Sequence, residues 1–415
     1  MEESKKRLLV ITGNLPYPIK LGIDTRVTGL LKSFSRRFEV HLVCKVGLRD
    51  YFNYVPQAKK YCTYVSASLA PNRKSNLHRL AYKIFFYLSF LLKGTPAELY
   101  YNNLSGIKNR ILKLIRNNHY DILFFEYWHW EKELIQACKG LKVVDTNDVQ
   151  FLRLSQIGEK KSVIITKPFT RFQMNRYKKM ELEHLHLFDL IVCTSEEDKK
   201  TFYKYLSPQK EIVIFPTGTD TEYFSPRKRE IGEDIVVFYG VMDGFMNIDA
   251  ALYLYREIMP LIWDKKRDVK LMVVGNNPSE EIRALNSDPR INVTGYVKDV
   301  REYLSMGKVV VLPLRISYGH RGRIFEVMAM GIPLVVTPQA IKGMEIKNGE
   351  GVIIEESPLS IAQGVLNILD KRLYAEQLGM KGRKVAGERF SPQATYDRLT
   401  DFLVEYSKKD RSEIK

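Results

Sequence analysis

Residues 318–337, YGHRGRIFEVMAMGIPLVVT, combine side chains that suit the binding of a phosphate. A glycine-containing loop is predicted after the apolar run 309–314, and Arg321 and Arg323 fall in the first turn of the helix predicted to follow. The free N–H groups of a helix N-terminus attract anions, and guanidinium groups add charge-assisted hydrogen bonds. Glu326 lies one turn after Arg323, where its carboxylate could reach hydroxyl groups of the same ligand.

Two interpretations of this segment are open. An ordinary solvated helix start with an Arg/Glu pair explains the local pattern. The segment also resembles the donor-site signature of retaining glycosyltransferases of family 4, which have the GT-B fold and in which a basic pair precedes Glu in the pattern LEAMAMGxPVV. The matching residues are Arg321, Arg323, Glu326, Ala329, Met330, Gly331 and Pro333.

The resemblance implies specific roles for these residues. It makes Arg321 and Arg323 catalytic groups that contact the donor diphosphate, and it places Glu326 on the ribose hydroxyls. The family pattern has a first carboxylate at the position of Tyr318. The remaining donor-side candidates are Gly22, Gly240, Val297, Tyr318, Gly319 and His320.

Further segments resemble the same family in the same order. Residues 215–226, FPTGTDTEYFSP, are similar to its interdomain pattern PNGVDTxxFxP, and residues 236–254 are similar to the strand, glycine turn and helix that open its donor domain. Residues 271–278 and 291–314 supply the next strand and helix units. A strand that ends in Gly is common in α/β proteins, so each segment is weak evidence alone and the order carries the resemblance.

The fold class expected is α/β, with two Rossmann-like parallel-sheet domains that face each other across a cleft. A chain of 415 residues exceeds the size that one core usually organises. Apolar runs typical of buried strands alternate with helix-length stretches in both halves. We expect an acceptor-binding domain at 1–207 and a donor-binding domain at 208–390, with a clustered Pro/Gly boundary between 207 and 226. By the resemblance, a helix at 391–408 crosses back to the first domain.

Cysteine usage and the N-terminal sequence favour a cytoplasmic protein. The four cysteines, Cys44, Cys62, Cys138 and Cys193, lie far apart without a CxxC pair, which favours reduced thiols over a zinc site. The first residues run directly from charges into a predicted strand, without the pattern of a signal peptide. No metal and no cofactor is expected, because no DxD motif stands in a suitable position.

Positive charge is concentrated in the first half of the chain. Residues 1–200 hold 34 Lys and Arg against 19 Asp and Glu, a balance of +15 out of the total of +17. Such a field favours anionic partners, so a glycan or lipid-linked acceptor at an anionic membrane surface is plausible, and generic basic solubility is the alternative. The aromatic run 77–92 is too short to span a bilayer and is expected to be a core helix or an interfacial one. Nucleic acid is disfavoured as a partner, because the basic residues are not accompanied by a helix-turn-helix, RNP or zinc-finger pattern.

Acceptor-side candidates lie after the predicted strands of the first domain. They are Asp24 and Arg26 after Gly22, Glu126 at the end of the strand 121–127, and Asp148 after the strand 141–145. Family members often carry a histidine near one of these strand ends. His129 is therefore the catalytic candidate here, because position 147 is Asn.

These observations predict a retaining, metal-independent glycosyltransferase that uses a nucleotide diphosphate sugar, with a role in surface polysaccharide or glycolipid synthesis. Two alternatives remain open. One is a degenerate GT-B protein that binds or scaffolds without turnover, motivated by Tyr318 and the single Gly22. The other is a nucleotide-sugar epimerase, which needs more acid and base groups than seven histidines readily supply.

Overall fold

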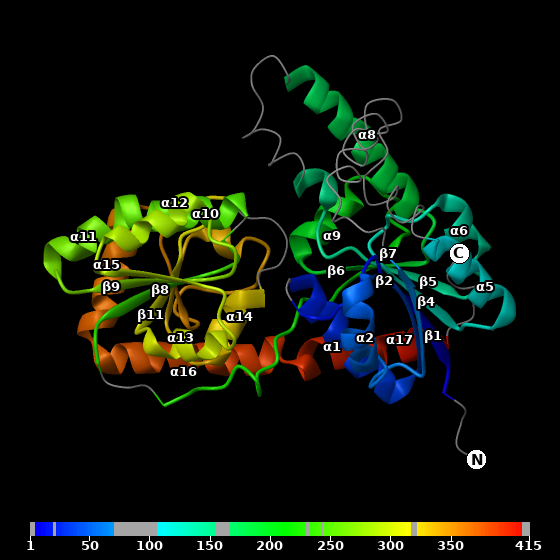
Figure 1. The fold of residues 1–415 in the computed structure, drawn as a ribbon. Coiled ribbons are helices and arrows are strands. Elements are labelled where there is room, and N and C mark those ends of the chain that lie inside the picture. Colours follow the sequence, from blue (N-terminus) through cyan, green and yellow to red (C-terminus); the bar gives the residue numbers. More distant parts are fainter. Residues whose placement is uncertain are drawn as a thin grey trace. The chain divides into compact units, whose positions relative to one another are not determined.

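A computed structural model describes residues 5–19, 22–69, 106–153, 167–228, 232–242, 244–316 and 322–408. The chain divides into two compact units, which are drawn in Figure 1. Unit 1 comprises Met1–Pro216 with Tyr396–Lys415, and unit 2 comprises Thr217–Thr395. The boundaries predicted from the sequence are 207 and 390. The predicted helix 77–92 and the loop residues Tyr318, Gly319, His320 and Arg321 lie outside the described residues.

The described part of unit 1 contains a seven-stranded sheet in the order β3-β2-β1-β4-β5-β6-β7, and the strand pairs are parallel. Its strands are β1 (Arg7–Ile11), β2 (Glu39–Val46), β3 (Tyr64–Leu69), β4 (Ile122–Glu126), β5 (Leu141–Asp145), β6 (Leu190–Cys193) and β7 (Glu211–Ile214). The order of connection reverses between β1 and β4. In open α/β sheets this switch point opens a crevice at the carboxyl ends of the strands, where ligands bind.

Helices pack on both faces of this sheet, as its apolar strands require (Figure 1). Alternate residues of β1 serve the two faces: Leu8 and Val10 belong to one core cluster, Leu9 and Ile11 to the other. The first cluster includes side chains from α1 (Gly22–Arg37), α2 (Leu48–Ala58) and α17 (Arg398–Tyr406). The second includes side chains from α5 (Ile107–Asn117), α6 (Lys132–Ala137), α8 (Lys167–Leu185) and α9 (Glu196–Tyr203).

The C-terminal segment packs on α1 within unit 1. Gly29 of α1 has no room for a side chain, because a Cβ there would lie 2.2 Å from the ring of Tyr396. Asp397 accepts hydrogen bonds from Ser33 at 2.5 Å and from Arg36 at 2.7 Å. These contacts hold α17 and its preceding turn η5 (Gln393–Asp397) against the first sheet's helices.

The described part of unit 2 contains a six-stranded sheet in the order β10-β9-β8-β11-β12-β13, again with parallel pairs. Its strands are β8 (Ile235–Tyr239), β9 (Lys270–Val274), β10 (Ile291–Gly295), β11 (Val309–Leu312), β12 (Leu334–Val336) and β13 (Val352–Ile354). The helical elements are α10 (Phe245–Tyr253), η2 (Leu254–Ile258), α11 (Met259–Lys265), α12 (Glu280–Arg283), η3 (Ala284–Ser287), α13 (Val300–Met306), α14 (Gly322–Ala329), η4 (Pro338–Ile341), α15 (Pro358–Asp370) and α16 (Arg372–Phe390). The switch point lies between β8 and β11.

Helix α14 is fixed from behind by α16. A Cβ on Gly379 of α16 would lie 2.2 Å from the carbonyl oxygen of Gly331, so the two backbones approach directly. Gly331 ends α14 with φ of 67°, a conformation that favours glycine. The rings of Phe325 and Phe390 stack at 3.7 Å. The helix that carries Arg323 and Glu326 is therefore held rigidly beside the switch point.

The predicted α/β class with two parallel-sheet domains is confirmed. In unit 1, β1, β2, β4, β5 and β6 coincide with the apolar runs at 8–13, 38–46, 120–127, 141–146 and 188–195, which are typical of buried strands. None of the helices in the described ranges has the length and apolarity needed to cross a membrane.

A buried ion pair joins α1 to the end of β5. Arg26 donates from Nε and Nη2 to the two carboxylate oxygens of Asp145, at 2.7 and 2.9 Å, and both side chains are 1% exposed. A buried charge is stable only when an opposite charge neutralises it, because water cannot reach the site to solvate it. The pair thus fixes α1 against the carboxyl edge of the sheet.

Removing half of this pair should destabilise unit 1. We expect Asp145→Asn to lower the free energy of unfolding by about 3 kcal/mol, since Arg26 would remain buried without its counter-charge. Urea unfolding followed by tryptophan fluorescence measures this, with Trp128 and Trp130 reporting from the same unit.

The matched control is the exposed pair Arg37–Asp401, whose side chains are 60% and 58% exposed. Asp401→Asn should cost less than about 1 kcal/mol. Equal losses in the two variants would show that the buried pair has no special part in the stability of unit 1.

Candidate functional site

The candidate site in unit 2 lies at the carboxyl end of β8, at the switch point of the sheet. Gly240 follows β8 directly, and its backbone is crowded on both sides. A Cβ on Gly275 would lie 1.7 Å from the carbonyl oxygen of Gly240, and a Cβ on Gly240 would lie 2.0 Å from Nη1 of Arg323. Only glycine at both positions allows β8, β9 and the Arg323 side chain to meet here.

Arg323, in the first turn of α14, reaches across this turn. Its Nη1 donates to the carbonyl oxygen of Tyr239 at 3.0 Å, and its Nη2 donates to Oδ1 of Asn247 at 2.9 Å. Its Nε is buried and has no partner within the described part of the chain. Burial lowers the pKa of Arg323 to about 10, so the side chain remains a cation at neutral pH. A fixed cation beside a helix N-terminus suits an anionic ligand.

Glu326 lies beside Arg323 and is held by Tyr239. The Tyr239 hydroxyl donates to Oε2 of Glu326 at 3.0 Å. Burial raises the pKa of Glu326 to about 7, and the bond from Tyr239 and the charge of Arg323 act in the opposite direction. Burial and the Glu326 charge raise the pKa of Tyr239 well above its ordinary value, so its hydroxyl stays a donor. The carboxylate therefore changes charge close to neutral pH, as groups at functional sites often do.

The other predicted donor residues make no recorded contact with Arg323 or Glu326 in the described part of the chain. Val297 is partly buried and packs on the core after β10, whose last residue, Gly295, has φ of 67°. Gly22 is exposed at the start of α1 in unit 1. Tyr318, Gly319, His320 and Arg321 lie outside the described residues.

In unit 1, polar groups meet at the carboxyl ends of β4 and β5. Burial raises the pKa of Glu126 to about 8, and the charges of Asp145 and Asp24 add to this, while a hydrogen bond from the Gly13 backbone opposes it. The next residue, Tyr127, has φ of 60°, and Asn147 after β5 has φ of 53°. Such conformations are unfavourable for residues with a side chain, and they concentrate at functional sites.

Two predicted site residues are instead buried structural groups. His129 is 5% exposed, packs between Trp128 and Tyr177, and bonds to the Tyr177 hydroxyl through Nε2 at 2.8 Å. Its ring is thus held in the core, and the catalytic role expected from the sequence stays a prediction. Arg26 is fully buried on Asp145 and is not placed to contact an acceptor.

The other two acceptor candidates lie at the expected strand ends. Asp24 is partly exposed in the first turn of α1. Asp148 is 7% exposed and accepts from Arg153 at 3.2 Å. The structure thus brings Asp24, Glu126 and Asp145 near one another and leaves Asp148 in a separate ion pair.

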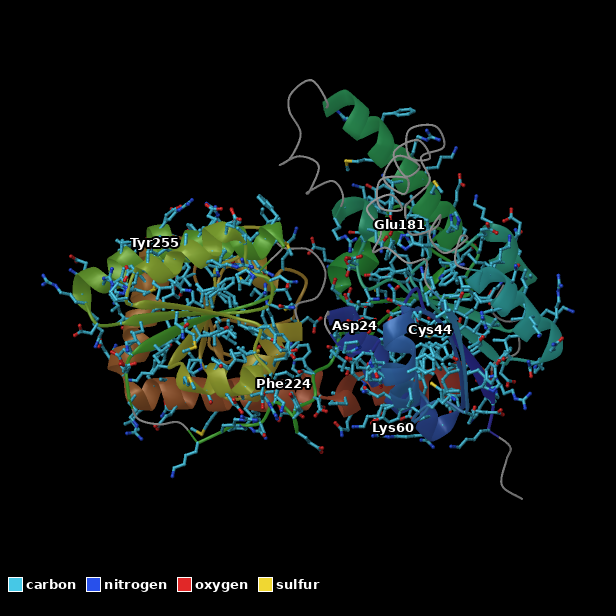
Figure 2. The ribbon with its side chains drawn as sticks, viewed as in Figure 1. Asp24, Cys44, Lys60, Glu181, Phe224 and Tyr255 are labelled. Atoms are coloured by element: carbon cyan, nitrogen blue, oxygen red, sulfur yellow. The ribbon has the colours of Figure 1, made fainter. Side chains whose placement is uncertain are left out.

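Sequence reasoning missed Tyr239, Asn247 and Glu181. Glu181 is 0% exposed and accepts from the backbone N–H groups of Gln150 and Phe151, at 3.1 and 2.8 Å, so α8 holds the turn that follows β5 (Figure 2). The sequence does hold a pattern that points to Glu181. It shares one helix face with Tyr177 and Leu185, at i, i+4 and i+8. Tyr239 and Asn247 carry no local pattern, since their partners lie more than 70 residues away.

Comparisons with known proteins find a family match within unit 2. Residues 233–371 match the family described as "Glycosyl transferases group 1". A capsular polysaccharide biosynthesis glycosyltransferase, CapM of Staphylococcus aureus, is 24% identical over 160 residues, which cover 36% of this chain. The match spans about two fifths of that relative, 42% of its length.

Solved structures resemble almost the whole chain. TarM has a TM-score of 0.69 at 13% identity, with 99% of this chain and 100% of that chain covered. HepE of Anabaena in complex with UDP-glucose has a TM-score of 0.64 at 9% identity, with 96% and 99% covered. The two sheets and these likenesses define the GT-B fold. The predicted resemblance to the glycosyl transferases group 1 family is confirmed, and residues 233–371, which contain Arg323 and Glu326, carry the family's sequence match.

The pKa of Glu126 makes the stability of unit 1 depend on pH. Its folded-state pKa of about 8 lies above the usual 4.5, so the unfolded chain ionises first as pH rises. Stability should therefore fall between about pH 4.5 and 8. Glu126→Gln mimics the protonated form and should remove this part of the fall, leaving the variant about 4 kcal/mol more stable than the parent at pH 8.5.

Urea unfolding at pH 5, 7 and 8.5 measures the difference between the two proteins. Burial also raises the pKa of Glu181 to about 8. Because Glu181 is present in both proteins, its effect on stability cancels in the difference between them. Curves for parent and variant that stay parallel across this range would show that Glu126 is already ionised in the folded state.

Proposed function

We propose that the protein is a glycosyltransferase that transfers a sugar from a nucleotide diphosphate sugar to an acceptor hydroxyl, with retention of configuration and without a metal ion. The observation that carries this proposal is the arrangement of Arg323 and Glu326 around Gly240. A fixed cation, the closely packed turn at Gly240 and a carboxylate lie together at a switch point. All three belong to the segment that matches the family.

The arrangement suits a nucleoside diphosphate. Arg323 and the N-terminus of α14 would neutralise the diphosphate, and Glu326 would accept hydrogen bonds from ribose hydroxyls. HepE, which shares the fold, has been crystallised with UDP-glucose, and this supports a nucleotide sugar as the donor here. In the described part of the chain no group of His, Cys, Asp and Glu is arranged to hold a metal ion, and the proposed chemistry uses none.

In the proposed reaction, the bond between the sugar's anomeric carbon and the diphosphate oxygen breaks while the acceptor oxygen bonds to the same carbon. The acceptor proton passes to an oxygen of the departing diphosphate, which leaves with the electron pair. Arg323 stabilises the charge that develops on the leaving group, and such electrostatic stabilisation commonly supplies the largest part of the rate enhancement.

Unit 1 is proposed to bind the acceptor, a glycan or a lipid-linked sugar of surface polysaccharide synthesis. CapM, the curated relative, is named for capsular polysaccharide biosynthesis. The basic balance of residues 1–200 would favour an acceptor presented at an anionic membrane surface, and we propose that the protein works there from the cytoplasmic side.

The function is tested by incubating the full chain with a panel of UDP, GDP and ADP sugars and measuring release of the nucleoside diphosphate, with and without lipid-linked acceptors. Parallel reactions contain EDTA. We expect turnover of one donor class that is stimulated by an acceptor and unaffected by EDTA. Binding of a nucleotide sugar without release would favour the scaffold alternative.

Loss of the Arg323 side chain should remove transition-state stabilisation. We expect Arg323→Ala to lower kcat/KM by about 10² or more with the best donor. The control is Arg372→Ala, which removes an exposed arginine of the same unit that pairs with Glu376. If Arg323→Ala lowers kcat/KM by less than about threefold, Arg323 does not stabilise the diphosphate.

Loss of the Glu326 charge should affect the ligand more than the fold. We expect Glu326→Gln to weaken nucleoside diphosphate binding about tenfold at pH 8, because a charge-assisted hydrogen bond is lost. Calorimetric titration measures the affinity. Glu281→Gln, which alters an exposed carboxylate paired with Arg256, is the control. Unchanged affinity in Glu326→Gln would make Glu326 a structural residue.

A further inference from the structure

We propose that Tyr239 and Asn247 are positioning residues of the donor site: Tyr239 holds the Glu326 carboxylate through its hydroxyl, and Asn247 holds the Arg323 guanidinium over Gly240. This inference rests on the proposed function, and it assigns roles to two residues for which the family resemblance gave none. It also predicts how nucleotide binding depends on pH.

Asn247 connects Arg323 to the turn after β8. Its Oδ1 accepts from Arg323 at 2.9 Å, while its Nδ2 donates to the carbonyl oxygen of Val241 at 2.7 Å. Arg323 in turn donates to the carbonyl oxygen of Tyr239 at 3.0 Å. The carbonyl groups on both sides of Gly240 are thus tied, directly or through Asn247, to one guanidinium.

This arrangement leaves Arg323 little freedom. Both terminal nitrogens are engaged, and Nη1 lies where a Cβ of residue 240 would be. Its Nε is buried and has no partner within the described residues. An amide at 247 can accept from the guanidinium and donate to the Val241 carbonyl at the same time. A carboxylate can only accept, and an apolar side chain can do neither.

Tyr239 acts on the carboxylate. Its hydroxyl donates to Glu326 from β8, and Arg323 is the charged group on the same helix that acts on Glu326. On the α16 side, Arg383 donates to the Ala329 carbonyl oxygen at the other end of α14. Tyr239 and Arg323 are therefore the groups of the described chain that favour the ionised form of Glu326.

The sign of the pH effect follows. Burial places the pKa of Glu326 at about 7, and the Tyr239 bond lowers it from where burial alone would put it. Ionised Glu326 accepts from ribose hydroxyls, so nucleotide affinity should rise as pH rises through this pKa. Removing the Tyr239 hydroxyl takes away a bond to the charged form, which moves the rise to higher pH.

The experiment titrates UDP into the full chain by calorimetry between pH 5.5 and 9, with GDP and ADP in its place if UDP does not bind. The proteins are the parent, Tyr239→Phe, Glu326→Gln and the double variant. The nucleotide phosphate itself titrates near pH 6 and also makes the affinity depend on pH. Glu326→Gln removes the carboxylate's part of this pH dependence and leaves the part of the phosphate. Tyr255→Phe, in the same unit and packed beside Trp263, is the matched control (Figure 2).

We expect the midpoint of the affinity rise to move up by about one pH unit in Tyr239→Phe. It should stay unchanged in Tyr255→Phe. The double variant should match Glu326→Gln alone, because Tyr239 acts through the carboxylate. Thermal unfolding without nucleotide checks that Tyr239→Phe is folded. An unchanged midpoint in folded Tyr239→Phe overturns the role of Tyr239.

Asn247 is tested independently by kinetics. Asn247→Leu should lower kcat/KM about tenfold, Asn247→Asp should lower it less, and Asn247→Leu should add nothing to Arg323→Ala. The control is Asn286→Leu, which removes a side chain that accepts from the Val293 backbone in the same unit and should affect stability only. Additive losses in Asn247→Leu with Arg323→Ala overturn its role. Failure of the parent chain to bind any of the three nucleotides instead overturns the proposed function, and this inference with it.

Discussion

The contact between the Arg323 guanidinium and the backbone at Gly240 is the constraint on which the candidate site depends. It requires a glycine, since a Cβ would lie 2.0 Å from Nη1. It also requires that α14 stand at a fixed distance from β8, and α16 ensures this through the close approach of Gly379 to Gly331. A cation held in this way needs little reorganisation when an anion binds, which is the basis of electrostatic preorganisation.

The two units use buried arginines in different ways. Arg26 in unit 1 is neutralised by Asp145, with both of that carboxylate's oxygens engaged, so it stabilises the fold. Arg323 in unit 2 has a carbonyl and an amide oxygen as partners, and neither carries a charge. Among the described residues, the carboxylate that acts on this charge is Glu326, whose pKa lies near neutrality. A buried cation without a full counter-charge gains by binding an anion.

The sequence predicted the fold well because its strands are continuous apolar runs. Strands such as β1 and β11 contain four or more consecutive buried residues, which only a sheet covered on both faces accommodates. The strands β3 and β7 were not identified, since YVSASL and EIVI are short and partly polar. Arg323 and Glu326 could be proposed because their spacing is local and resembles a family pattern.

Sequence could not decide which way a side chain turns after a strand ends. His129 follows β4 as closely as a site residue would, but Tyr127 adopts a positive φ and the chain turns His129 into the aromatic cluster of Trp128 and Tyr177. The same limit applies to Tyr239, whose hydroxyl meets Glu326 across 87 residues of sequence. Contacts of this kind depend on sheet order and register, which local patterns do not contain.

The net charge of unit 1 does not predict the local charge at the ends of its strands. Unit 1 is strongly basic, and α5 alone carries four cations, Lys108, Arg110, Lys113 and Arg116, without an acidic residue. The ends of β4 and β5 are locally acidic: burial raises the pKa of Glu126, and the negative charges of Asp145 and Asp24 raise it further. Net charge governs long-range attraction to a surface, while a few carboxylates govern what binds at the strand ends. The electric field near Glu126 therefore differs from the field around the basic helices of unit 1.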